Sequence, residues 1–140
     1  MTFTIKKTTW DADEAALRSV REAVFIKEQR VPAELEWDDK DADSVHFLAL
    51  DSENNPIGCI RLMPSGQISR LSVLEQHRNG GIGKALLMAA ADEAKAMDMK
   101  EIFLHAQTHA TSFYEAAGFT VTGGIFLEAD IPHRQMFKQL

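Results

Sequence analysis

The stretch of the chain best suited to chemistry is the glycine-rich segment Gln76-His-Arg-Asn-Gly-Gly-Ile-Gly83, with three glycines in its last four positions. Glycine has no Cβ atom and adopts positive φ angles, so successive backbone N–H groups can turn toward a closely bound ligand. If a helix begins here, its N terminus adds partial positive charge. The segment therefore predicts a loop that cradles the phosphate or pyrophosphate of a nucleotide cofactor.

Two familiar phosphate-binding patterns fit this segment poorly. The Walker pattern G-x-x-x-x-G-K-[ST] fails because Arg78 stands where its first glycine belongs, and because Ala85 after Lys84 has no hydroxyl for Mg²⁺. The dinucleotide pattern G-x-G-x-x-G begins at Gly81 but places its third glycine on Leu86. A P-loop NTPase is excluded, whereas a dinucleotide-binding protein and a plain structural glycine turn stay as alternatives.

A third pattern, [R/Q]-x-x-G-x-[G/A] between a strand and a helix, matches Arg78-Asn-Gly-Gly-Ile-Gly83 in full. Further along, Ser112-Phe-Tyr-Glu-Ala-Ala-Gly-Phe119 resembles the signature F-Y-x-x-x-G-F. With these motifs and its order of strands and helices, the chain resembles the GNAT N-acetyltransferases from about Thr4 to Lys138. Four shorter segments are similar to a branch of small bacterial members described as ElaA-like or glucosamine-phosphate acetyltransferase-like: Val24–Gln29, Asp38–Asp41, His105–Gln107 and Ile131–His133.

This resemblance implies an enzyme that uses acetyl-CoA and no metal, and that acetylates a primary amine of a small molecule by direct attack in a ternary complex. In the family, the pantetheine arm lies along the strand before the cradle, and a backbone amide of that strand polarises the thioester carbonyl. The cradle supplies main-chain donors to the pyrophosphate, beside a charged arginine. The cofactor-binding residues expected on this basis are Leu71, Ser72, Val73, Arg78, Asn79, Gly80, Gly81, Ile82, Gly83, Lys84, Phe113 and Tyr114. The alternative is a noncatalytic acyl-CoA-binding or regulatory domain with the same fold.

The same resemblance suggests the groups that transfer protons. Aminolysis of a thioester needs a neutral amine and, less stringently, an acid for the leaving thiolate. Tyr114 stands where the family commonly keeps a tyrosine near the CoA sulfur, so its phenol is the expected general acid, with simple packing as the alternative. The candidates for the base are Glu28, His105 at the end of a strand and His133 in an expected late turn, with a water-relayed transfer as the alternative.

Two further histidines are expected to be structural. His46 and His77 fall in a strand and a loop without a catalytic partner, so both are expected to be structural.

His105 and His109 are four residues apart, which could suggest a metal site. The predicted strand ends between them, however, and no carboxylate or cysteine completes a site. The sequence therefore predicts no metal.

Acidic residues are crowded into one segment, which holds only Arg30 and Lys40 against them. It contains seven carboxylates: Glu28, Glu34, Glu36, Asp38, Asp39, Asp41 and Asp43. One interpretation is a solvated loop, and the other is a wall that attracts a cationic amine. An aminosugar phosphate is the competing acceptor, and basic side chains such as Arg61 or Arg70 would have to offset the acids for it to bind.

Length and composition set the broad class of the protein. With 140 residues, 45% hydrophobic and 26% charged, the chain fits one ordinary globular domain spanning residues 1–140. The single cysteine, Cys59, excludes an intramolecular disulfide and favours a reducing compartment.

The N terminus lacks a secretory signal and the longest apolar run, Ala85–Ala91, is too short to span a bilayer, so we expect a cytoplasmic protein without a membrane partner. A net charge of −6 argues against nucleic acid as a partner. Whether the protein is a monomer or a homodimer stays open.

Periodicity predicts the elements that must position these residues. Helices are expected at Asp11–Phe25 with Asp11 as a possible cap, at Gly83–Met97 with an apolar stripe, and at Thr108–Ala117 with Gly118 in the left-handed position that ends a helix. Strands are expected at Thr4–Thr8, Val45–Leu50, Ile57–Met63, Gln67–Val73, Glu101–Ala106, Thr120–Phe126 and Arg134–Lys138. This order predicts an α/β (α+β) single-domain GNAT fold, in which a mixed sheet of about six or seven strands, splayed at the cofactor site, is flanked by about four helices.

Overall fold

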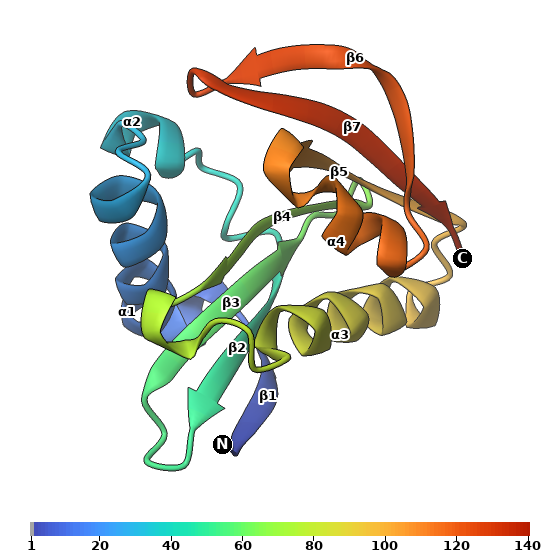
Figure 1. The fold of residues 1–140 in the computed structure, drawn as a ribbon. Coiled ribbons are helices and arrows are strands. Elements are labelled where there is room, and N and C mark those ends of the chain that lie inside the picture. Colours follow the sequence, from blue (N-terminus) through green and yellow to red (C-terminus); the bar gives the residue numbers. More distant parts are fainter. Residues whose placement is uncertain (1) are drawn as a thin grey trace.

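The computed structural model describes residues 2–140, which form a mixed sheet of seven strands with helices on both faces (Figure 1). The strands are β1 (Phe3–Thr8), β2 (Val45–Asp51), β3 (Pro56–Leu62), β4 (Gln67–Val73), β5 (Glu101–Gln107), β6 (Thr120–Glu128) and β7 (Ile131–Gln139). The α-helices are α1 (Trp10–Arg21), α2 (Ala33–Glu36), α3 (Ile82–Ala96) and α4 (Thr111–Ala116). The predicted fold class is confirmed.

The sheet is splayed in its middle. Its strand order is β1-β2-β3-β4-β5-β7-β6, and all neighbours are antiparallel except β4 and β5, which run parallel. In the described part of the chain, these two strands pair only at Gln67–Phe103 and Ile68–Leu104. Beyond those pairs the two strands are not hydrogen-bonded to each other, so the facing edges of β4 and β5 have no strand partner there.

A bulge in β4 lies beside this gap. Arg70 and Leu71 together face the single residue Ile60 of β3. Arg70 has a φ of 59°, a left-handed conformation that costs a residue with a side chain about 1–2 kcal/mol. The hydroxyl of Ser72 donates a 3.2 Å hydrogen bond to the carbonyl of Arg70. Since a bulge bends its strand and increases the local twist, it accounts for the departure of β4 from β5.

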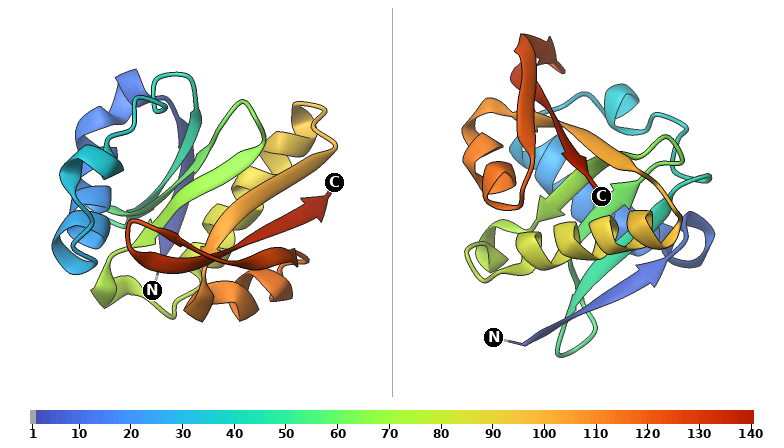
Figure 2. Two further views of the ribbon diagram at one scale, coloured as in Figure 1. Left: turned by 90° about the horizontal axis from the view of Figure 1, so that it is seen from above. Right: turned by 90° about the vertical axis from the view of Figure 1, so that its right-hand side faces the viewer.

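Each face of the sheet has its own core, and Figure 2 shows α1 and α3 on opposite sides of the strands. On the α3 side, Leu86, Ala90 and Ala94 are buried as the predicted stripe requires. The fourth predicted member, Met97, is 45% exposed because the helix ends before it. On the α1 side, Leu17 packs in a smaller buried cluster with residues of β2 and β3.

The first helix differs from the prediction at both ends. Its N-cap is Thr9, whose side chain accepts a 3.2 Å hydrogen bond from the amide of Ala12, so Asp11 lies inside the helix. After Arg21 the chain continues as a π-helical segment (Glu22–Glu28) rather than as α-helix. Periodicity detects the buried stripe in both forms but does not distinguish their hydrogen bonding, so the prediction of one helix to Phe25 was too simple.

The last two strands are longer than predicted. They meet in a two-residue turn at Ala129 and Asp130, which have φ angles of 52° and 60°. Such a turn usually contains Asn-Gly or Asp-Gly, so its sequence signal is absent here. As a result His133, expected in a turn, lies in β7 opposite Gln107 of β5. In contrast, Gly118 has the predicted left-handed conformation, with a φ of 95°.

Candidate functional site

The glycine loop joins the open edge of β4 to the start of α3. A short 3₁₀ turn (Glu75–His77) leads into the loop, and Gly81, at the N-cap of α3, has a φ of 85°. The amides of Ile82, Gly83 and Lys84 belong to the first helical turn, where no carbonyl of the same helix can accept from them. A Cβ atom built on Gly81 would meet no described atom within 4 Å, so the chain is open on this side. This arrangement fits a pyrophosphate.

The aromatic motif of α4 lies directly against this loop. A Cβ atom built on Gly83 would be 3.6 Å from the ring of Phe113 and 3.9 Å from Val73 of β4. The neighbouring ring of Tyr114 packs at right angles to Phe113 (5.1 Å between centroids) and to Phe119 (6.0 Å). Burial raises the pKa of Tyr114 to about 12. The two sequence motifs, separated along the chain, therefore lie next to each other in the structure.

The edge of β4 presents backbone groups to the gap in the sheet. The amide of Leu74 donates to Ile57 of β3 (2.9 Å), so it points away from the gap. Because backbone groups alternate in direction along a strand, the amides of Leu71 and Val73 point toward the gap. Ser72, also expected at the cofactor, is 3% exposed and uses its hydroxyl within the protein, on the carbonyl of Arg70.

Arg78, the first residue of the motif, forms an ion pair. Its guanidinium donates to both carboxylate oxygens of Glu28, at 2.6 and 2.7 Å, and its Nε donates to the carbonyl of Val73 at 3.0 Å. These hydrogen bonds from Arg78 lower the pKa of Glu28. Glu28 is therefore a weaker proton acceptor than an ordinary glutamate, and Arg78 links the π-helical segment to the end of β4.

The other two candidate bases lie together on β5 and β7. The Nδ1 atom of His105 is 3.0 Å from Oε1 of Glu128, and the Nε2 atom of His133 is 3.7 Å from Oε2 of the same carboxylate. The ring of Phe126 contacts both imidazoles, with centroid distances of 5.1 Å to His105 and 5.9 Å to His133. Sequence reasoning missed Glu128, which lies only in the extension of β6 beyond its predicted end.

The two histidines once considered for a metal bind different partners. His105 contacts Glu128, whereas the Nε2 atom of His109 lies 2.7 Å from Oε1 of Gln107. Within residues 2–140, no group of three or more histidine, cysteine, aspartate or glutamate side chains is arranged to hold a metal ion. Nor does this part of the chain contain a helix with the length and apolar character needed to cross a membrane.

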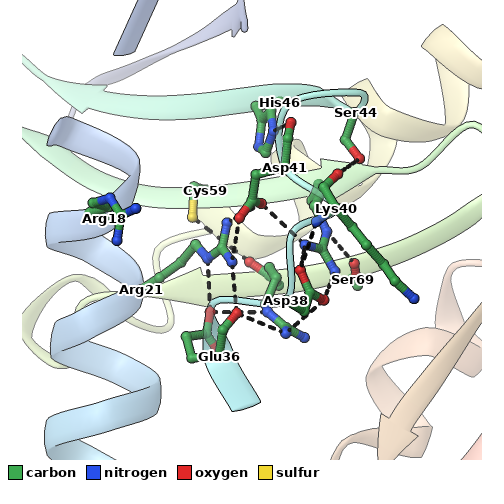
Figure 3. Close-up of polar contacts among 12 residues, drawn as sticks. Arg18, Arg21, Glu36, Asp38, Lys40, Asp41, Ser44, His46, Cys59 and Ser69 are labelled. Carbon is green, nitrogen blue, oxygen red and sulfur yellow. Dashed lines mark hydrogen bonds and ion pairs between the residues drawn. The ribbon is translucent and has the colours of Figure 1, made fainter. Parts of the chain in front are cut away.

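Much of the acidic segment is built into a buried network of ions (Figure 3). Arg21 of α1 contacts Glu36 (2.8 Å) and Asp41 (2.6 Å), and both carboxylates are almost fully buried. Arg61 of β3 binds Asp38 with two hydrogen bonds, at 2.8 and 3.0 Å. The bulged Arg70 completes the network, at 3.0 Å from Glu36 and 3.1 Å from Asp38. Three arginines thus balance three carboxylates.

Burial and pairing change the ionisation of these groups. Burial raises the pKa of Glu36 even between two arginines. For Asp38, burial acts in the same direction, but the hydrogen bonds and charge of Arg61, together with Arg70, outweigh it and lower the pKa to about 2. Burial also lowers the pKa of His46, whose Nε2 lies 2.9 Å from the carbonyl of Asp41, in agreement with a structural role.

This network corrects both interpretations of the acidic segment. Glu28, Glu36, Asp38 and Asp41 are paired with arginines, so they form neither a solvated loop nor an attractive wall. The three acids outside these pairs, Glu34, Asp39 and Asp43, are exposed, and Glu28 is exposed although it is paired with Arg78. The arginines that could have offset the segment for a phosphate, Arg61 and Arg70, are already engaged by its carboxylates.

The fold and the loop together define a class of protein: a splayed α/β sheet that presents main-chain donors at a strand–glycine loop–helix junction. The comparison with known families is specific, because residues 10–140 match the acetyltransferase (GNAT) domain. The chain therefore belongs to the GNAT acetyltransferase family.

Several relatives agree with this assignment. The uncharacterized N-acetyltransferase YjcF of Bacillus subtilis (strain 168) is 40% identical over 123 residues, which cover 85% of this chain and 87% of YjcF. Protein ElaA of Escherichia coli (strain K12) is 28% identical over 133 residues, covering 89% of this chain and 86% of ElaA. The crystal structure of an acyl-CoA N-acyltransferase from Pseudomonas aeruginosa superposes with a TM-score of 0.87 at 26% identity, covering 98% of this chain and 99% of that one.

Proposed function

We propose that the protein is an acetyl-CoA-dependent N-acetyltransferase that acetylates a primary amine of a small molecule by direct attack in a ternary complex. The observation that carries the proposal is the junction of β4, the glycine loop and α3, with Phe113 lying against Gly83. It supplies helix-start amides for a pyrophosphate and a strand edge for the rest of the cofactor. Membership of the GNAT family supports the reaction class.

The residues of the chain have distinct tasks in this proposal. Acetyl-CoA supplies the thioester, whose carbonyl carbon bonds to the amine nitrogen while its C–S bond breaks. The amides of Leu71 and Val73 hold the cofactor along the gap, and a donor on this edge stabilises the charge that develops on the carbonyl oxygen. The phenol of Tyr114 is protonated at neutral pH, as a tyrosine of ordinary pKa also is, so it carries a proton for the departing thiolate.

Replacing Tyr114 with phenylalanine should lower kcat roughly tenfold to a thousandfold, with little change in the apparent affinity for acetyl-CoA. The substitution keeps the ring that packs on Phe113 and Phe119 and removes only the hydroxyl. Steady-state kinetics that follow the free thiol of CoA measure the effect. A variant as active as the parent would show that Tyr114 only packs in the core.

The structure favours a cationic acceptor over an aminosugar phosphate. A cavity of about 470 Å³ is lined by the exposed Asp39 and Asp43, with Lys40, and by Phe103 on β5. Since Arg61 and Arg70 are bound to carboxylates, neither is free to receive a phosphate on this side. We therefore propose a small amine that is attracted as a cation and loses a proton before attack.

Two measurements test the proposed function. Acetyl-CoA at a hundredfold excess over its dissociation constant should stabilise the fold by roughly 2.7 kcal/mol, and NADH should have much less effect in the same thermal-shift assay. Free thiol should then be released faster with spermidine than with glucosamine 6-phosphate. A response to NADH without one to acetyl-CoA would show that the loop binds a dinucleotide. Binding of acetyl-CoA without transfer would favour the noncatalytic alternative.

A further inference from the structure

The position of His105 in the sheet is suited to proton transfer from the acceptor. Its neighbours Leu104 and Ala106 are buried in the core on the α3 side. Because side chains alternate along a strand, His105 lies on the opposite face, away from Tyr114, which packs against that core. His105 also directly follows Leu104, the last residue of β5 that pairs with β4. It therefore lies where the gap in the sheet opens.

Glu128 determines which nitrogen of His105 carries a proton. A carboxylate accepts hydrogen bonds and, when ionised, cannot donate them, so the Nδ1 atom 3.0 Å from Oε1 must be the donor. In the neutral ring, the lone pair then belongs to Nε2. The side chain of His105 is 27% exposed, and no hydrogen bond from the described residues occupies Nε2. This is the state that a general base requires.

The other candidates have less suitable geometry. Nδ1 of His133 lies 2.6 Å from the carbonyl of Ile131, so it too carries the proton. Its Nε2, however, faces Glu128 at 3.7 Å in a side chain that is only 8% exposed. Both oxygens of Glu28 are bound by Arg78. His133 and Glu128 are thus the titratable groups that face His105, and His105 alone among the three presents an available lone pair.

We infer that His105 is the general base of the transfer reaction and that Glu128 is its positioning residue, an inference that depends on the proposed function. Nε2 takes a proton from the acceptor nitrogen, which forms its bond to the carbonyl carbon. The C–S bond breaks and the thiolate takes the proton of Tyr114. The proton on His105 is later lost to solvent, and the phenolate of Tyr114 regains a proton from solvent. The carboxylate of Glu128 holds Nδ1–H and stabilises the imidazolium. Acid and base thus act from opposite faces of the splayed sheet.

The first test reads the tautomer directly and needs no acceptor. Long-range ¹H–¹⁵N NMR spectra of the neutral imidazoles should show His105 as the Nδ1–H form in the parent protein. In Glu128→Ala this form should give way to the Nε2–H form, whereas Glu128→Gln, whose amide oxygen can still accept, should retain it. An Nε2–H tautomer in the parent, or no change in Glu128→Ala, would overturn the positioning role.

The second test uses turnover with spermidine and with glucosamine 6-phosphate, measured in parallel. His105→Gln should lower kcat roughly 100-fold near pH 7 without weakening acetyl-CoA binding, and its rate should approach that of the parent at high pH, where the amine is already neutral. Glu128→Ala should lose more activity than Glu128→Gln. The matched control His109→Gln, at the same end of β5, should behave like the parent.

The outcomes separate this inference from the proposed function. If the parent transfers acetyl groups and His105→Gln does so equally well at pH 7, His105 is not the base although the enzyme assignment stands. If the parent binds acetyl-CoA but transfers to neither amine, the proposed transfer and the base role fail together. The NMR result would then still decide whether Glu128 orients His105.

Discussion

Replacing Gly83 with valine is expected to weaken acetyl-CoA binding about 100-fold or more, or ~3 kcal/mol. The site of a Cβ atom on Gly83 is already 3.6 Å from the ring of Phe113 and 3.9 Å from Val73. The branched methyl groups of valine would therefore fill the space between the loop, β4 and α4 where a pyrophosphate must approach the backbone. Isothermal titration calorimetry with acetyl-CoA measures the loss.

Two matched variants separate lost binding from lost folding. Gly83→Ala adds only a Cβ at ordinary contact distance, in a helical position where alanine is favoured, so it should be as stable as the parent. Gly124→Val adds a side chain in β6, where a Cβ meets no described atom within 4 Å, and should bind normally. Gly81→Val is a poorer test, because its φ of 85° strains any branched residue. Unchanged affinity in Gly83→Val would place the cofactor elsewhere.

Arg21→Met is expected to lower the free energy of unfolding by about 3–5 kcal/mol. The substitution removes the cation shared by Glu36 and Asp41 and leaves these buried carboxylates with one arginine each, Arg70 for Glu36 and Arg61 for Asp41. Urea unfolding followed by far-ultraviolet circular dichroism measures the change. Tryptophan fluorescence is less suitable, because the rings of Trp10 and Trp37 lie 5.5 and 5.1 Å from the guanidinium carbon of Arg21.

The control for this prediction is an ion pair of similar length on the surface. Lys7 lies 2.9 Å from Glu93, but its side chain is 57% exposed. Solvent screens such a pair, so Lys7→Met should change the free energy of unfolding by less than about 1 kcal/mol. If Arg21→Met had no larger effect than Lys7→Met, the network would contribute little to the fold.

The parts of the site that lie close together in sequence were predictable. The glycine loop is a local pattern, because both the spacing of its glycines and the start of the following helix can be predicted from the sequence. In the structure Gly81 is left-handed and α3 begins at Ile82, as this pattern predicts. The approach of Phe113 to this loop follows from the family resemblance and not from any spacing rule. Whether these groups bind acetyl-CoA stays a prediction.

The buried ions could not be predicted, because pairing depends on contacts between distant segments. Glu36 and Asp38 look like any solvated acids in the sequence, and their partners Arg21, Arg61 and Arg70 come from three separate elements. The combination of a crowded acidic segment with arginines in predicted apolar elements was the available signal. It does not determine which charges meet.

Glu128 escaped prediction for a related reason. The strand β6 continues to Glu128 only because the turn at Ala129 and Asp130 forms without the usual glycine. With the strand expected to end at Phe126, nothing in the sequence placed Glu128 beside His105. The contact between Glu128 of β6 and His105 of β5 therefore depends on a turn that the sequence does not indicate.

The splay also has a mechanical consequence. The paired strands β1–β4 form one leaf of the molecule and β5–β7 the other. Among the described residues, strand pairing between the two leaves is limited to Gln67–Phe103 and Ile68–Leu104. The amides at the start of α3, which we propose bind the pyrophosphate, belong to the first leaf, whereas Tyr114 and His105 belong to the second. A small rotation about Ile68 and Leu104 changes the distance between these groups without breaking any other strand pair. The stiffness of the short β4–β5 pairing therefore determines how accurately the glycine loop is aligned with Tyr114 and His105.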